Sequence, residues 1–257
     1  MNEGRIVYAM AYRQLKRYLR AKSRLLGTLL NPLMFFLFLG LGWSATLRGS
    51  ATRQLFGGLD YLSFLAPGIV VMAVFTSSLA GGISVIWDRE FGFLKEVLVA
   101  PASRSYAIIG RALGDSITSV LQGLIMILSL YLLAPSLRLE GLVPALTVSF
   151  MTAITFNSLG IAIASKMRSP EGFQLIMNLI TLPLIFLSGA FYPIDNLPAY
   201  VKPIFYANPL TFAVDLARSY LTGISSLNPA IDWIVLLSVS AVFLLASIRV
   251  FGRSTID

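Results

Sequence analysis

The stretch YLSFLAPGIVVMAVFTSSLAGGISVI occupies residues 61–86 and contains no charged side chain. It is longer than the roughly 20 apolar residues that a helix needs to cross a bilayer core about 30 Å thick. It also lacks the alternation of polar and apolar residues that a strand of a membrane barrel requires. The stretch therefore predicts a membrane-spanning helix.

The whole chain of 257 residues has the same character. Apolar residues make up 56% of it and charged residues only 12%, which is about half of what a soluble domain carries. In water such a chain would expose large apolar patches. We therefore expect an all-α integral membrane protein. Six spans are expected, at about 25–47, 61–86, 106–134, 142–165, 173–191 and 231–250.

Lys and Arg are unevenly divided between the two sides of the predicted membrane. With both termini on one side, that side holds fifteen of the twenty basic residues, and the other side holds five. Cytoplasmic loops carry the excess of basic residues in membrane proteins. We therefore expect a multi-pass protein of the cytoplasmic (inner) cell membrane with both termini in the cytoplasm. The net charge of +8 follows this sidedness and does not indicate nucleic acid.

Residues 1–24 are expected to form an amphipathic helix before the first span. Tyrosine and leucine recur on one face at spacings of three and four, beside a basic stripe. Such a helix lies in the headgroup layer and contacts membrane lipid. Alternatively, the basic residues only hold the N-terminus inside, and both interpretations can apply together. The stripe contains Arg13, Lys16, Arg17 and Arg20.

The connection between the last two expected spans, residues 192–225, is apolar and aromatic but interrupted by prolines. Asn208-Pro209 predicts a helix start, with Asn as N-cap and Pro at the first helical position. Gly223 predicts the end of that helix. Its roughly 14 residues would be about 21 Å long, too short to span. We expect re-entrant helices on the outer side; a helix lying flat on the outer surface is the alternative.

Charge gathers in WDREFGFLKEVLVAPASR, residues 87–104, between the second and third expected spans. Apolar residues at helical spacing and a terminating Pro101 predict a short amphipathic helix over about 88–99. Charges of both signs around phenylalanine suit a protein interface better than anionic lipid; a solvated connector is the alternative. The residues expected at this interface are Asp88, Arg89, Glu90, Phe91, Gly92, Phe93, Leu94, Lys95, Glu96 and Leu98.

Catalytic chemistry is poorly supported. The chain contains no Cys and no His, which excludes thiol and Ser-His nucleophiles and His-ligated metals. No Gly-Lys dipeptide occurs, so there is no phosphate-binding loop of the ATPase type. A lipid-modifying enzyme would need a nucleophile–base pair or a metal cluster. We expect a chain that is not an enzyme and that binds no metal or cofactor itself.

Polar residues within the spans are candidates for a gate or a transport pathway, because buried charge in a membrane is costly. Arg111 and Asp115 stand one turn apart and form either a structural pair or a gating site. The deeper amides either join helices by hydrogen bonds or line a pathway. Asp215 and Arg218, in the expected re-entrant helix, suggest an external gate. The full set is Arg111, Asp115, Gln122, Asn157, Asn178, Asp215 and Arg218.

Three segments together resemble the membrane subunits of ABC-2 type exporters: REFGFLKEVLVAPASR (89–104), FLSGAFYPIDNLP (186–198) and NPLTFAVDLARSYL (208–221). The multidrug, daunorubicin-resistance type is most similar, and lipo-oligosaccharide exporter subunits are also similar. The resemblance covers essentially the whole chain. It implies two permease copies, expected to be a homodimer, paired with two separate ATPase subunits that hold ATP and Mg²⁺.

The resemblance further implies that the segment from Asp88 to Leu98 is a coupling helix that docks in a groove of the ATPase. The implied function is export of a drug-like, lipid or glycolipid substrate. The alternative is a secondary transporter or channel that is not driven by ATP. Such a transporter would usually show inverted repeats and carboxylates at the midplane.

Overall fold

The computed structural model describes residues 3–47, 49–92, 104–167 and 169–252, and these residues contain no strand. Five stretches of the described residues are long and apolar enough to cross a membrane: Leu26–Thr46, Tyr61–Glu90, Ser105–Tyr131, Leu139–Lys166 and Pro229–Gly252. A further apolar helix, Pro170–Phe186, has 17 residues, at the short limit for a span. The expectation of an all-α integral membrane protein is confirmed.

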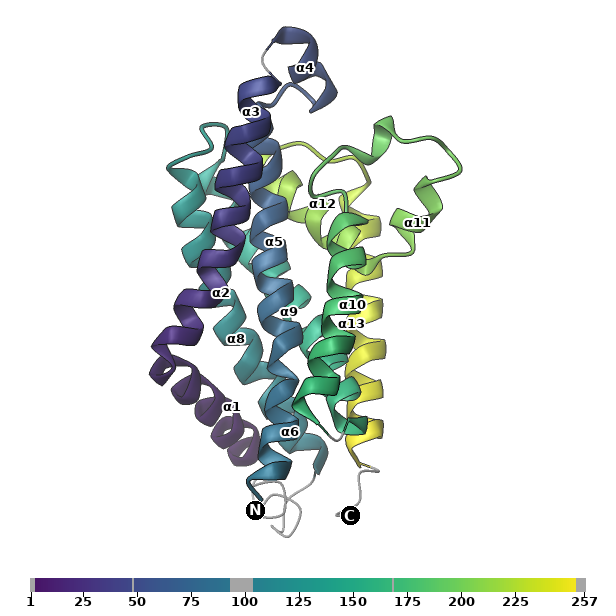
Figure 1. The fold of residues 1–257 in the computed structure, drawn as a ribbon. Coiled ribbons are helices and arrows are strands. Elements are labelled where there is room, and N and C mark those ends of the chain that lie inside the picture. Colours follow the sequence, from purple (N-terminus) through teal and green to yellow (C-terminus); the bar gives the residue numbers. More distant parts are fainter. Residues whose placement is uncertain (1–2, 48, 93–103, 168, 253–257) are drawn as a thin grey trace.

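The helices form one elongated bundle (Figure 1). The start of α1, the end of α6 and the end of α13 lie at one end of it, and α4, α11 and α12 lie at the other. The α-helices are α1 (Glu3–Arg20), α2 (Lys22–Phe35), α3 (Gly42–Thr46), α4 (Ser50–Leu55), α5 (Tyr61–Gly81), α6 (Ile83–Glu90), α8 (Arg104–Tyr131), α9 (Leu142–Lys166), α10 (Pro170–Phe186), α11 (Lys202–Tyr206), α12 (Pro209–Thr222) and α13 (Pro229–Gly252).

The centre of the bundle is α5, most of which is buried. Gly82, where α5 passes into α6, packs directly on the backbone of Gly160 in α9, and neither position has room for a Cβ atom. Phe75 lies two turns before Gly82, and Phe156 lies one turn before Gly160. Their rings meet edge to face with centroids 4.6 Å apart. The two glycines therefore hold α6 firmly against α9, which sets where the end of α6 lies.

The first span changes its geometry in the middle. α2 continues through Pro32 and passes into a π-helical segment, Phe36–Leu41, before α3 begins. Gly40 lies in that segment, and a Cβ atom there would come within 2.9 Å of the Leu62 side chain. The widened turn therefore packs closely on α5, and such turns are frequent at functional sites.

Two elements end at other residues than the sequence predicts. The fifth span, predicted to reach residue 191, ends at Phe186, because the chain turns at Gly189 with a φ of 69°. The separate helix predicted to begin at residue 88 does not begin there. Instead, α6 carries the second span on to Glu90, and the chain turns at Gly92 with a φ of 77°.

The segment predicted to be re-entrant contains α12, which packs among α5, α9 and α13. Asn208 caps it: its side-chain oxygen accepts from the Leu210 amide at 3.0 Å. Gly223 ends it in the left-handed conformation, with a φ of 79°. Most of its residues are buried. The helix is therefore enclosed by the bundle end (Figure 1) and does not lie flat upon it.

Candidate functional site

α1 crosses the base of the bundle and packs against the start of α8 (Figure 1). The contact depends on two glycines of α8 one turn apart. A Cβ atom at Gly110 would lie 2.6 Å from the Val7 carbonyl oxygen, and one at Gly114 would lie 2.8 Å from Ala11 Cα. Small residues at this spacing let two helices approach closely. The GxxxG spacing of residues 110–114 is the signal of this contact in the sequence.

The apolar face predicted for α1 is divided in the structure. Tyr8 and Tyr12 stack on each other, with ring centroids 6.1 Å apart, and are exposed together with Leu19. Tyr18 is buried against the bundle, as is Gln14, which the sequence analysis did not single out. The exposed half of the helix therefore carries two of the predicted tyrosines, and the bundle-facing half carries a polar residue at its most buried position.

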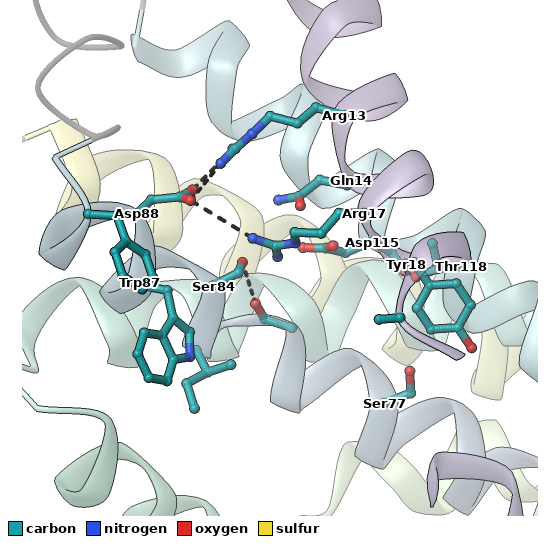
Figure 2. A pocket seen from close by; sticks show the side chains of 14 residues that line it. Arg13, Gln14, Arg17, Tyr18, Ser77, Ser84, Trp87, Asp88, Asp115 and Thr118 are labelled. Atoms are coloured by element: carbon teal, nitrogen blue, oxygen red, sulfur yellow. Dashed lines mark hydrogen bonds and ion pairs between the residues drawn. The ribbon is translucent and has the colours of Figure 1, made fainter. Parts of the chain in front are cut away.

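The basic stripe of α1 is divided as well. Lys16 and Arg20 are exposed, and the Lys16 ammonium lies 5.6 Å from the centroid of the Tyr12 ring. Arg13 and Arg17 turn toward the bundle (Figure 2). Only part of the stripe is therefore directed at the surroundings of the protein.

Asp88, near the end of α6, accepts charged hydrogen bonds from arginines of two other helices. Arg13 donates from both terminal nitrogens, at 2.6 Å to Oδ1 and 3.1 Å to Oδ2. Arg17 lies 3.8 Å from Oδ1. Arg111 of α8 donates to Oδ2 and, at 3.0 Å, to the hydroxyl of Ser84. One carboxylate therefore joins α1, α6 and α8.

The placement of Asp88 corrects the expectation that it belongs to a water-facing interface. Its side chain is almost fully buried, because α6 prolongs the second span and α1 covers its end. A buried carboxylate is stable only with charged hydrogen-bond partners. Arg111, predicted beside Asp115, supplies one of them and is only 2% exposed. Asp88 is thus an internal anchor of the helix bundle.

Arg89 fastens the end of α6 to the end of α9. It donates to the carbonyl oxygens of Met167 at 2.8 Å and Ser165 at 2.9 Å. A guanidinium suits the C-terminal carbonyls of a helix because these carry partial negative charge. Asp88 and Arg89, adjacent in sequence, therefore bind α6 to three neighbouring helices.

Beyond these anchors the chain presents exposed side chains. Phe91 is 78% exposed and stacks on Trp87, with ring centroids 5.7 Å apart and planes 13° from parallel. Glu90 and the turn at Gly92 complete the described part of this end. The other predicted interface residues, Phe93, Leu94, Lys95, Glu96 and Leu98, lie outside the described residues.

A cavity of about 410 Å³ opens beside the Asp88 cluster, between α1, α5–α6 and α8. Burial within it lowers the pKa of the Arg17 guanidinium below its ordinary value, and the nearby Asp115 and Asp88 oppose that shift. Figure 2 shows Arg17 reaching toward both carboxylates. The polar and charged residues that line the cavity are Arg13, Gln14, Arg17, Tyr18, Ser77, Ser84, Asp88, Asp115 and Thr118.

The deeper polar residues have three different settings. Gln122 donates to the hydroxyl of Thr28 and so links α8 to α2. Asn157 is fully buried against Gly81, and its amide has no hydrogen-bond partner among the described residues. Asn178 is exposed on α10 and accepts from Gln174 at 3.1 Å. Of the three, Asn178 is the one presented on the outside of the bundle.

Asp215 fastens the chain at the opposite end of the bundle. Its carboxylate accepts from the hydroxyl of Ser225 at 2.6 Å and from the amides of Ser226 at 2.9 Å and Leu227 at 3.0 Å. These bonds join α12 to the connection that leads into α13. The residue is buried.

Arg218 holds the other side of α12. It donates to the Gly189 carbonyl at 2.8 Å, and its guanidinium lies 3.9 Å from the centroid of the Phe64 ring. It is 3% exposed. The contacts of both expected gate residues are therefore internal ones that fix the loops at this end.

This combination defines a class: a multi-pass helical membrane protein whose second span ends in an anchored, partly exposed junction beside an N-terminal helix. Residues 5–222 match the ABC-2 type transporter family. The chain belongs to that family, the permease component of ABC transporters, and the family implies an ATPase partner subunit.

Individual relatives agree with this assignment. The chain is 30% identical over 202 residues to ycf38 of Cyanophora paradoxa, covering 77% of this chain and 68% of that protein. It is 25% identical over 240 residues to the "Probable doxorubicin resistance ABC transporter permease protein DrrC" of Mycobacterium tuberculosis, covering 87% and 79%. It is also 25% identical over 169 residues to the "Inner membrane transport permease YadH" of Escherichia coli, covering 65% and 66%.

Proposed function

We propose that this permease is the membrane-spanning subunit of an ATP-driven exporter and that it carries no catalytic step itself. ATP and Mg²⁺ would be held by a separate ATPase subunit. The observation that carries the proposal is an exposed aromatic pair at the end of α6. Trp87 and Phe91 stack there on each other, next to the anchoring residues Asp88 and Arg89.

An exposed aromatic residue on a rigid support is what a protein interface uses as an anchor. The support here is rigid because Asp88 is held from α1 and α8, and Arg89 is held from the end of α9. A force applied at Phe91 would therefore reach three other helices through short, charged hydrogen bonds. This arrangement suits a junction that transmits closure of an ATPase into the membrane part.

A second copy of the chain is proposed to face α2 and α10. A polar hollow of about 410 Å³ lies between these helices and α5, and Asn31, Thr76 and Asn178 line it. Around it, Leu175 and Leu179 of α10 are largely exposed. Polar side chains are costly against lipid, so a protein partner or a hydrated pathway is the more favourable cover. We assign the pathway to this face and the pairing to a homodimer.

The chain contains no Cys, so single cysteines test the pairing directly. Asn178→Cys on α10 should form a disulfide between two copies in membranes under mild oxidation. Leu128→Cys, also exposed but on α8, is the matched control and should stay monomeric. Cross-linking at Leu128 with none at Asn178 would show that the dimer interface involves α8 and not α10.

The proposed direction is outward and the proposed location is the inner membrane, with both termini in the cytoplasm. The basic excess at the end where α1 begins and α13 ends supports this orientation. The names of DrrC and YadH, a drug-resistance permease and an inner membrane permease, are consistent with it. The substrate we propose is a drug-like molecule, lipid or glycolipid.

Co-purification tests the central proposal. The tagged chain, extracted gently from its native membrane, should bring an ATPase with it. Phe91→Ala should lower the co-purified amount by a factor that corresponds to about 2 kcal/mol of interface energy. Tyr200→Ala removes an equally exposed aromatic side chain at the opposite end and should change nothing. Equal ATPase recovery for both variants would show that Phe91 is not an anchor.

A further inference from the structure

Three guanidinium groups meet at the edge of the cavity between α1, α6 and α8. Arg13, Arg17 and Arg111 converge on the single carboxylate of Asp88, and each guanidinium has five N–H donors and no acceptor. Asp115 adds a second carboxylate at the cavity wall. The cluster therefore carries one more positive than negative charge and favours an anion with several acceptor oxygens.

Gln14 gives an independent indication of a ligand. It lines the same cavity, it is only 1% exposed, and neither atom of its amide has a partner among the described residues. Figure 2 shows it projecting from α1 between Arg13 and Arg17. A buried amide without partners is unfavourable, because both of its polar atoms lose their hydrogen bonds to water. A ligand with both acceptor oxygens and a hydroxyl donor would satisfy both of its atoms.

The location indicates where such a ligand comes from. The cavity is lined by residues of α1, the end of α5, α6 and the first half of α8. Because α1 crosses the base of the bundle near the ends of the spans (Figure 1), the cavity opens close to the level of lipid headgroups. Its wall also includes the apolar side chains of Ile83 and Trp87, and tryptophan is typical of this level. A cavity of about 410 Å³ is large enough for a small polar headgroup.

We propose that this cavity binds a phosphate group, held by Arg17 and Gln14 and carried by an anionic phospholipid. Phosphate and guanidinium are well matched, because both form several short charged hydrogen bonds in fixed directions. A headgroup hydroxyl would donate to the Gln14 amide oxygen or to Asp115. The occupant would fill the space under α1 and complete its docking, whatever substrate the permease moves.

The test uses the purified full chain in mild detergent and needs no ATPase, so it is separate from the test of transport. Native mass spectrometry would count the ligand retained per chain with phosphatidylglycerol, with diacylglycerol of the same acyl chains, and with inorganic phosphate alone. We expect one retained phosphatidylglycerol and no retained diacylglycerol. Retention of inorganic phosphate in place of the lipid would identify the free ion as the source of the phosphate group.

Substitutions on neighbouring positions of α1 provide the matched control. Arg17→Gln should weaken phosphatidylglycerol retention at least about tenfold, through loss of a charged hydrogen-bond donor. Lys16→Gln removes the same charge from an exposed position outside the cavity and should stay within about twofold. If Arg17→Gln does not yield folded protein, Gln14→Glu replaces it. The new carboxylate should repel phosphate and weaken phosphatidylglycerol retention by a similar factor. Equal retention in Lys16→Gln and the cavity variants, or no preference for phosphatidylglycerol over diacylglycerol, would overturn the proposal.

Discussion

Arg13 and Asp88 are 75 positions apart in the chain, and their side chains meet at 2.6 Å. This pair fastens the N-terminal helix to the end of the second span. Arg111 reaches the same carboxylate from α8, so the position of α1 is coupled to the junction that we propose as the ATPase contact. A displacement of α1 should therefore displace the end of α6, and the reverse.

Asp88→Asn should destabilise the protein by about 3 kcal/mol, because it leaves the buried Arg111 guanidinium without its carboxylate. Glu90→Gln is the matched control: it makes the same change two residues later at an exposed position and should have almost no effect. Thermal unfolding in detergent measures the difference. Similar unfolding temperatures for the two variants would show that the Asp88 cluster adds little stability.

Gly114→Leu should dislodge α1 from α8, because a side chain there would overlap the α1 backbone at Ala11. The expected cost is about 1–3 kcal/mol, typical of overpacking. Gly27→Leu enlarges a helical glycine that has no atom within 4 Å of its Cβ position, and it should be tolerated. With Gln14→Cys as reporter, a thiol reagent should label the Gly114→Leu protein faster. Unchanged labelling would show that α1 docks without this contact.

Topology can be tested in intact cells. Asn196→Cys lies at the end of the bundle that holds α11, and Glu171→Cys lies in the first turn of α10 at the other end; both positions are exposed. An impermeant maleimide should label only Asn196→Cys, because the basic excess places the Glu171 end inside. Labelling of Glu171→Cys alone would reverse the orientation of the whole protein.

Asp215→Asn should lower stability by about 2 kcal/mol and leave transport by the remaining folded protein intact. The amide cannot accept all three hydrogen bonds from Ser225, Ser226 and Leu227 that the carboxylate accepts. Asp195→Asn makes the same change at an exposed position near the same end and should be neutral. Measured per folded molecule, a selective loss of transport in Asp215→Asn would restore the interpretation of Asp215 as a gate.

The sequence by itself determined the class of the protein and most of the helix positions. Long uncharged stretches such as residues 61–86 must be helical in a bilayer, since each backbone group needs a partner within its own segment. Local signals also sufficed at α12, where the cap at Asn208 and the stop at Gly223 depend only on neighbouring residues.

Tertiary structure alone decided which polar residues meet. Arg111 was expected beside Asp115, one turn away, but its guanidinium bonds across to Asp88 on α6. Gln14 is the most deeply buried polar residue of α1, although its local pattern marks it as a surface position. Pairings of this kind depend on how closely helices approach, and Gly110, Gly114, Gly82 and Gly160 set those approaches between segments far apart in the chain. Periodicity along one helix carries no information on its distance from another, and for that reason the anchored junction and its cavity became visible only in three dimensions.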